Sequence, residues 1–262
     1  VAHDFGAAAL VATLLAAAAF CAGASAIYIL NDLLDLEADR LHPEKRLRPI
    51  ASGALPIRDA MVASGGLALL ALALAWGAGP PVAGLTLFYM VLNLSYSLWL
   101  KKRRWIDLAS LAVMFLLRVL TGAAAAQIAV PGLVLGLVFA VFFTLACVKR
   151  MTALARATDG GQLPGRGYSR ADFKRLEWVA AAGIAVSAAL FLVYAFSGHS
   201  AALYESQLLL AVAVLPLAAW LFRVVRLSEQ GRENYDPVRF VTHDRTGLLI
   251  AALGAGLVLL AV

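Results

Sequence analysis

The chain has 262 residues, of which 62% are hydrophobic and 15% are charged, and its mean hydropathy is +0.84. Soluble domains are nearer half apolar and a quarter charged, so this composition excludes an ordinary soluble domain and predicts an integral membrane protein. The net charge of +6 would suit a nucleic-acid-binding protein, but the placement of the basic residues explains it differently, and we expect no nucleic-acid partner.

Eight apolar segments follow one another along the chain, and most approach the roughly 20 residues that a helix needs to cross the hydrocarbon core. Backbone polar groups in lipid must be satisfied internally, and these runs do not alternate as barrel strands do, so each is predicted to be a helix. They cover residues 5–30, 60–77, 81–100, 105–126, 133–148, 176–196, 201–222 and 246–262. The sequence therefore predicts an all-α, polytopic membrane helix bundle that forms a single domain over residues 1–262.

Lysine and arginine occur in every second connection between these segments. Five lie within residues 40–58, four within 101–104, seven within 149–175 and five within 223–245, which leaves only Arg118 inside a segment. The positive-inside rule places all four basic loops in the cytoplasm. The first segment then runs inward and the last ends outside, so we expect a preceding helix, for nine in total, in the full protein.

Four oxygen-bearing side chains follow the first apolar segment: Asn31, Asp32, Asp35 and Asp39. At about 100° per residue the three aspartates fall within an arc of about 60°, flanked by the asparagine, while Glu37 lies on the other side. Like charges on one helical face repel, and Mg²⁺, which prefers oxygen ligands, would compensate them. We therefore predict a catalytic Mg²⁺ site at these residues; the alternative is a solvated helix end.

Basic residues that follow the acidic ones offer charge-assisted hydrogen bonds to phosphate oxygens. Those in the same loop are Lys45, Arg46 and Arg48, and those in later basic loops are Lys101, Lys149 and Arg150. Carboxylates that bind a metal, followed by basic residues that bind phosphates, predict a metal–diphosphate site at the cytoplasmic membrane face.

Several polar and aromatic residues are candidates for lining a substrate cavity, namely Tyr28, Asn93, Tyr96, Asp107, Arg118 and Tyr168. An arginine inside a membrane span usually faces the bundle interior or a water-filled cavity. Two roles are open for Arg118: tying helices together by bonding carbonyl groups, or contacting substrate. For Asp107 the alternatives are site lining and a cap for the basic run before it; for Tyr96 they are cavity lining and interfacial anchoring.

The pattern Asn-Asp-x-x-Asp-x-x-x-Asp resembles the first aspartate motif of the UbiA superfamily of intramembrane prenyltransferases, and residues 31–39 match it completely. The resemblance implies nine transmembrane helices, bound Mg²⁺ and an active site that opens to the cytoplasm. The second motif of that superfamily, Asp-x-x-x-Asp, belongs within residues 149–175, where this chain has only Asp159 and Asp172. That departure counts against ordinary prenyl transfer.

One branch of the superfamily, the polyprenyl-phosphate (decaprenyl-phosphate) phosphoribosyltransferases, resembles this chain more closely. The similar stretches are residues 31–53, Lys149-Arg150, residues 167–169, Asp236-Pro237 with Phe240, and Asp244-Arg245. The resemblance implies transfer of ribose 5-phosphate from phosphoribosyl diphosphate, a small-molecule donor, to a polyprenyl phosphate in the membrane. That branch commonly has Lys-Arg-Tyr-Ala-Glu where this chain has Lys-Arg-Met-Thr-Ala at residues 149–153.

Two alternatives remain open at this point. The first is transfer of a prenyl group from an isoprenyl diphosphate to an aromatic or other small ring acceptor. The second belongs to another class, a membrane transporter or a non-catalytic membrane subunit. A transport route would place charges near the midplane of the membrane, whereas the acidic residues of this chain gather at one end of a span.

Overall fold

The computed structural model describes residues 6–157, 163, 165–229 and 244–262. All regular elements in these ranges are helices, which confirms the predicted all-α class. Contacts between Cα atoms group the chain into two compact units, Val1–Leu100 with Leu117–Ala129, and Lys101–Leu116 with Val130–Val262. The helix α5 (Arg104–Ala125) contributes its first part to the second unit and its last part to the first. The single-domain organisation stays a prediction.

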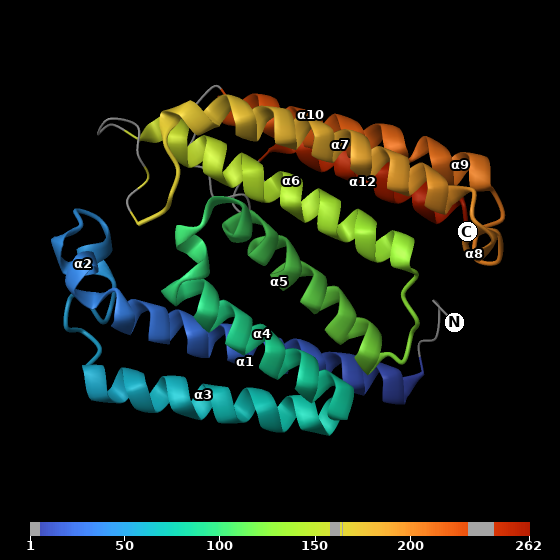
Figure 1. Ribbon diagram of the computed structural model, residues 1–262. Coiled ribbons are helices and arrows are strands. Elements are labelled where there is room, and N and C mark those ends of the chain that lie inside the picture. The colour runs from blue at the N-terminus through green and yellow to red at the C-terminus, as the bar shows by residue number, and fades with distance from the viewer. Residues whose placement is uncertain (1–5, 158–162, 164, 230–243) are drawn as a thin grey trace. The chain divides into compact units, whose positions relative to one another are not determined.

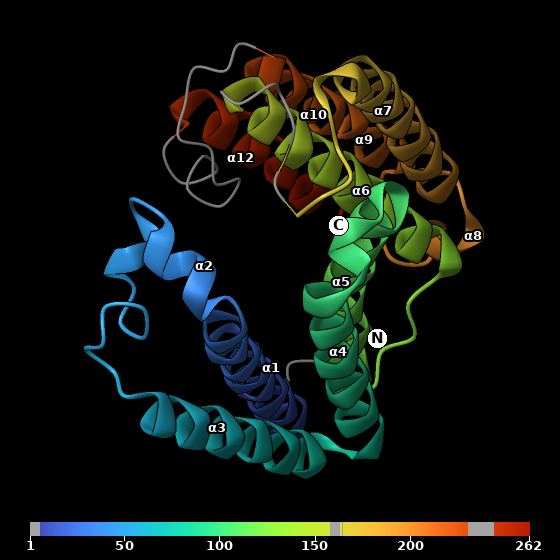
Figure 2. The same ribbon diagram turned by 60° about the vertical axis from the view of Figure 1, so that its left-hand side comes forward.

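In the first unit, α1 (Ala7–Leu34) packs along α3 (Ile57–Ala78) and α4 (Pro80–Leu98), as Figures 1 and 2 show. The contact is made mainly by small side chains, and Ala16, Ala19, Ala75 and Val82 form its core with Ala125 of α5. Small residues let helix backbones approach closely in a membrane, where apolar side chains gain little by leaving lipid. The short helices α2 (Leu36–Leu41) and η1 (Lys45–Leu47) follow α1 at one end of this unit.

In the second unit, the start of α5 and α6 (Gly132–Arg156), α7 (Phe173–Ala195) and α10 (Val214–Glu229) share a core around Leu108, Met151, Leu176 and Val224. The remaining elements are η3 (Arg170–Asp172), α8 (Gly198–Ala201), α9 (Gln207–Val212) and α12 (Arg245–Leu260). The short η2 (Leu100–Lys102) joins the two units. Gly183 of α7 lies against α6, where a Cβ atom would come within 2.1 Å of the Thr144 hydroxyl.

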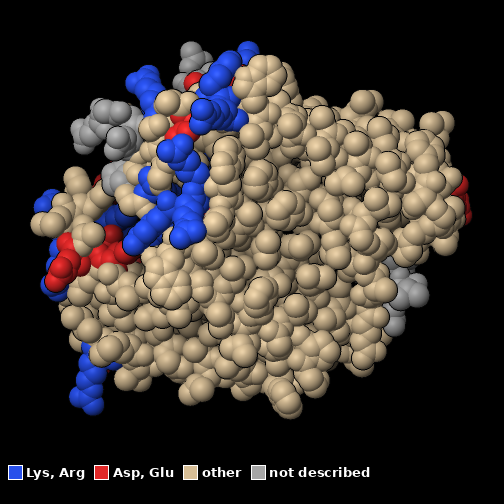
Figure 3. Space-filling view, in the orientation of Figure 1, with Lys and Arg blue, Asp and Glu red and all other residues tan. Residues whose placement is uncertain are grey.

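Seven of the eight predicted apolar segments each lie largely on one helix, and residues 201–222 are divided mainly between α9 and α10. Seven spans among the described residues are long and apolar enough to cross a membrane, with α9 and α10 together forming one of them, whereas α12 has 16 residues. On the face drawn in Figure 3, most of the surface is formed by uncharged side chains, as a lipid-facing surface requires. The chain is therefore an integral membrane helix bundle, while its orientation and the expected preceding helix stay predictions.

Candidate active site

The acidic segment begins where α1 ends. A continuous helix through Asp39 underlies the predicted arc, but α1 stops at Leu34, and Asp35 forms a turn with φ −94° and ψ 9° before α2 begins. The hydrogen bonds keep helical spacing across this turn, because the Asp35 amide donates to the Asn31 carbonyl at 2.9 Å and the Asp39 amide donates to the Asp35 carbonyl at 2.8 Å. The interruption therefore bends the acidic segment without breaking its helical periodicity.

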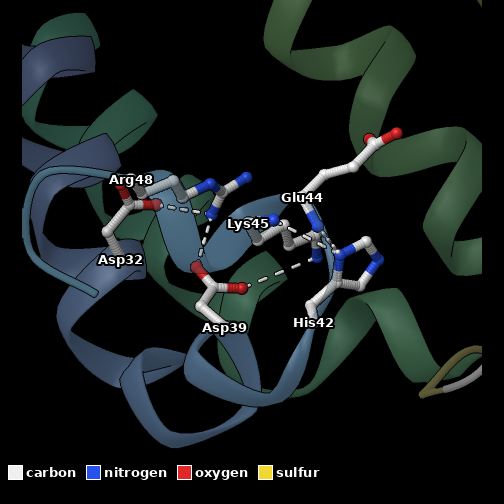
Figure 4. A network of polar contacts seen from close by, with 6 residues as sticks. All are labelled: Asp32, Asp39, His42, Glu44, Lys45 and Arg48. Carbon is white, nitrogen blue, oxygen red and sulfur yellow. Dashed lines mark hydrogen bonds and ion pairs between the residues drawn. The ribbon is translucent and has the colours of Figure 1, made fainter. Parts of the chain in front are cut away.

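Arg48 joins two of the predicted metal ligands. Its Nη1 atom lies 2.8 Å from Asp32 Oδ1 and 2.7 Å from Asp39 Oδ2 (Figure 4). The Asp39 side chain is only 2% exposed, and Lys45 Nζ lies 3.7 Å from its other carboxylate oxygen. Burying a carboxylate is costly unless it is paired, so the two cations explain how Asp39 is accommodated. The sequence predicts a phosphate contact for Arg48, and the structure adds its contact with the two aspartates.

The loop between α2 and α3 folds back so that these cations reach the aspartates. His42 Nδ1 accepts hydrogen bonds from the backbone amides of Glu44 and Lys45 at 3.2 and 3.3 Å, which fixes the start of η1 (Figure 4). The Arg48 amide then donates to the Lys45 carbonyl at 2.9 Å, and Ile50 is buried. A short local network therefore holds Lys45 and Arg48 against the acidic segment.

These residues fit a divalent cation. One oxygen of Asp32 and one of Asp39 converge on a single positively charged nitrogen, so the guanidinium stands where a metal cation would have two carboxylate ligands. Beside them, Asn31 Oδ1 is buried and accepts no hydrogen bond from any described residue. In the described ranges no group of three or more His, Cys, Asp or Glu side chains that could hold a metal occurs. Mg²⁺ usually takes one or two carboxylates together with water and phosphate oxygens.

A second polar cluster lies in the second unit, around Asp107. This carboxylate is fully buried, and Arg150 binds it through two bonds, Nε to Oδ2 at 2.5 Å and Nη2 to Oδ1 at 2.9 Å. Arg166 Nη1 adds a contact of 3.3 Å. Paired, doubly hydrogen-bonded geometry is what a buried charge requires. The Arg150 side chain is 3% exposed, so its position is explained by neutralising Asp107, and its predicted phosphate contact stays a prediction.

The loop that carries Arg166 is fastened to the start of α5. The Tyr168 hydroxyl donates to the Arg104 carbonyl, and Arg104 in turn donates through Nε to the Gly167 carbonyl and through Nη1 to Asp172 at 2.8 Å. Burial and the neighbouring Asp107 carboxylate raise the pKa of Tyr168, so it stays a hydrogen-bond donor. At Gly167 a Cβ atom would lie 3.0 Å from the Lys102 carbonyl oxygen, and glycine permits this close approach.

The remaining predicted residues are spread more widely. Arg118 lies over the rings of Phe20 and Tyr89, with its Cζ atom 5.9 and 5.6 Å from their centroids, and Asn93 Nδ2 donates to the Tyr89 hydroxyl at 3.1 Å. The contacts of Phe20 and Tyr89 with Arg118 are not predicted from the sequence. The spacing of four residues between Tyr89 and Asn93, which places both on one face of a helix, could have indicated that Tyr89 lies beside Asn93. Tyr28, Arg46 and Lys149 are exposed, Tyr96 and Lys101 are half-buried, and Asp159, Asp236 and Phe240 lie outside the described residues.

Asp244 and Arg223 form a further ion pair at the start of α12. Arg223 contacts both carboxylate oxygens, through Nε at 2.8 Å and Nη2 at 2.9 Å. This hydrogen-bonded guanidinium, together with the amides of Gly247 and Thr246, holds the pKa of Asp244 below its usual range against the opposing effect of burial. The pair joins α10 to α12, and this contact gives both side chains a structural role.

The chain is similar in sequence to several known proteins. The chain is 32% identical over 238 residues to protein y4nM of Sinorhizobium fredii, and the match covers 87% of this chain and 45% of that protein. It is 32% identical over 257 residues to the nodulation protein NoeC of Azorhizobium caulinodans, covering 94% and 81%. It is 39% identical over 109 residues to the decaprenyl-phosphate phosphoribosyltransferase of Mycolicibacterium smegmatis, covering 42% and 34%. The chain thus spans less than half the length of the first and third of these relatives.

A solved structure has the same fold. The UbiA homologue from Archaeoglobus fulgidus, bound to DMAPP and Mg²⁺, matches with a TM-score of 0.72 and 17% identity over 96% of this chain and 87% of that one. The model of the UbiA prenyltransferase family matches residues 2–250, nearly the whole chain. The resemblance found in the acidic motif is thereby confirmed, and the chain belongs to the UbiA prenyltransferase family.

Proposed function

We propose that the chain is a Mg²⁺-dependent membrane transferase that acts on a diphosphate-activated donor at the acidic segment of α1 and α2. The observation that carries this proposal is the convergence of Asp32 and Asp39 on one cationic nitrogen, at 2.8 and 2.7 Å. The proposed donor is phosphoribosyl diphosphate, and the proposed acceptor is a polyprenyl phosphate. The basic loops support a site that faces the cytoplasm.

Each residue of the site has a defined task in this proposal. Asp32, Asp39 and Asn31 Oδ1 would hold Mg²⁺, with Asp35 beside them, and the bound ion would supply charge stabilisation to the departing diphosphate. The carboxylates then no longer need Arg48, whose guanidinium becomes available for phosphate oxygens together with the side chain of Lys45. These cations stabilise charge that develops as the donor bond breaks.

The proposed transfer needs no further reagent besides the donor and the acceptor. An oxygen of the lipid phosphate forms a bond to the anomeric carbon of the ribose, and the bond from that carbon to the diphosphate oxygen breaks. The electron pair leaves with the diphosphate, and the phosphate nucleophile is already ionised, so no general base is required. In the acidic segment, Asp32 and Asp39 each contact a cation.

The phosphoribosyl donor is supported by the 39% identity to the Mycolicibacterium enzyme, which covers 42% of the chain. A second candidate is prenyl transfer from an isoprenyl diphosphate to a small ring acceptor. It is supported by the family description and by the homologue bound to DMAPP and Mg²⁺. Both candidates use the same metal–diphosphate site, because they differ in the carbon that the diphosphate leaves and in the acceptor.

One assay with two donor–acceptor pairs separates these candidates. Purified protein with Mg²⁺ receives labelled phosphoribosyl diphosphate with polyprenyl phosphate, or labelled prenyl diphosphate with a phenolic acid. We expect transfer in the first pair, its loss in Asp39→Asn, and near-normal rates in Glu37→Gln, a matched control on the exposed side of α2. Transfer in the second pair alone would overturn the donor assignment. Failure of both pairs with folded protein would favour the transporter or non-catalytic subunit.

A further inference from the structure

A cavity inside the first unit lies along the same face of α1 as the acidic segment. It has a volume of about 410 Å³ and is lined from α1 by Thr13, Ala16, Ala17, Phe20, Cys21 and Ala24. Counted from Asp32 at about 100° per residue, all of these except Ala16 fall between about 240° and 340°. Asn31 falls in the same sector, as do Asp35 and Asp39, which follow the end of α1 with helical spacing. The cavity therefore lies deeper in the span, on the side of α1 that leads to these residues.

The last part of α5 closes the other side of this cavity with Arg118, Thr121 and Gly122. Arg118 is 14 residues into α5, about 21 Å from its start, and a charge at such depth is expensive unless it faces an interior or a water-filled space. Phe20 and Tyr89 present their ring faces to its guanidinium, which offsets part of that cost. The side chain nevertheless remains exposed to the cavity.

The composition of the walls defines what this cavity would bind. Alanine and glycine leave room for an apolar body, the guanidinium offers charge-assisted hydrogen bonds to an anionic oxygen, and Tyr89 with Asn93 supports the cation from α4. A volume of 410 Å³ lies within the range of small-molecule sites. At about 30 Å³ per water-sized group it holds roughly fourteen non-hydrogen atoms.

We infer that this cavity is a second binding site, for an amphipathic anion with its carboxylate or phosphate on Arg118 and its apolar body against the alanines of α1. Phe20, which lies beneath the guanidinium, is twelve residues from Asp32, so the two sites are about 18 Å apart along α1. An anion on Arg118 is therefore distinct from a diphosphate held at the acidic segment. The inference stands independently of which donor the acidic segment binds.

Alkylation of a native cysteine can report whether this cavity is occupied. Cys21 lines the cavity and is exposed, whereas Cys147 is fully buried. A ligand in the cavity should therefore slow alkylation of Cys21 by N-ethylmaleimide, measured by mass spectrometry on full-length protein in zwitterionic nanodiscs. The probes are laurate and decyl phosphate, which resemble lipid anions, benzoate, which represents a soluble ring carboxylate, and dodecanol as a neutral control.

We expect saturable protection of Cys21 by an anionic probe at a concentration at least tenfold below that of dodecanol. Protection by decyl phosphate or laurate assigns a lipid source, and protection by benzoate alone assigns a soluble one. In Arg118→Gln the anionic probe should protect Cys21 no better than dodecanol does. In Arg58→Gln, which removes an exposed charge at the start of α3, the anionic probe should still protect Cys21 at the lower concentration.

A purely structural role for Arg118 predicts a different pattern. If the guanidinium only links α1, α4 and α5, then anionic probes should protect Cys21 of wild-type protein no better than dodecanol does. That result would overturn the inference. Ala24→Leu provides a variant that fills the cavity and leaves Arg118 in place. It should abolish protection while Mn²⁺ binding at the acidic segment, followed by electron paramagnetic resonance, stays normal; unchanged protection in this variant would also refute the site.

Discussion

Replacing Arg48 with glutamine should destabilise the metal-free protein and at the same time strengthen its binding of Mg²⁺. Removing one partner of a buried ion pair costs about 3–5 kcal/mol, whereas exposed pairs contribute about 0–1 kcal/mol. Asp39 is 2% exposed but Arg48 is 40% exposed, and Lys45 stays near the same carboxylate. An intermediate loss of about 2 kcal/mol in the free energy of unfolding is therefore expected without metal.

The gain in metal affinity follows from the same contact. Arg48 and Mg²⁺ compete for the oxygens of Asp32 and Asp39, so metal binding in wild-type protein must first displace the guanidinium. Removing a competitor that contributes about 2 kcal/mol tightens binding by at most about thirtyfold, since each 1.4 kcal/mol is tenfold. In Arg48→Gln we expect Mg²⁺ to bind about ten to thirty times more tightly when no donor is present.

Isothermal titration with Mg²⁺ and thermal unfolding with and without the ion measure both effects. The loss of thermal stability in Arg48→Gln should shrink when Mg²⁺ is saturating, because the metal then neutralises Asp39. Arg58→Gln is the matched control and should change neither quantity. Equal or weaker Mg²⁺ binding by Arg48→Gln in the absence of donor would show that the guanidinium and the metal do not share a site, and would refute the reasoning.

Two further predictions concern ion pairs in the second unit. Arg150→Gln removes the doubly hydrogen-bonded cation of the fully buried Asp107, so the free energy of unfolding should fall by about 3–5 kcal/mol. Lys149→Gln, at the exposed neighbouring residue, should cost much less; equal losses would argue against a structural Arg150. The lowered pKa of Asp244 means that its pairing stabilises the fold above the ordinary aspartate pKa of about 3.9 and ceases to do so as pH falls through the lower folded-state value. The stability difference between wild-type protein and Arg223→Gln should therefore be full at neutral pH and vanish in acid, and a difference that persists below both pKa values would contradict this assignment.

Much of the architecture was accessible from local sequence. All eight apolar segments are largely helical, although residues 201–222 are divided mainly between α9 and α10. A run of apolar residues in lipid has few other ways to satisfy its backbone polar groups. The acidic motif was equally local, since a spacing of three and four residues places side chains on one helical face whatever the rest of the chain does. That motif also carried the family resemblance, which the match over residues 2–250 confirmed.

The partners of the charged residues were decided by tertiary structure alone. Arg48 and Asp39 are close in sequence, but the fold of a loop directs the guanidinium to carboxylates rather than to solvent. Asp107 and Arg150 lie 43 residues apart, and Arg118 meets one ring from α1 and another from α4. Helical periodicity fixes which side chains share a face of one helix. Which charge neutralises which depends on how helices pack and how loops fold back, and several of those contacts join residues far apart in the chain.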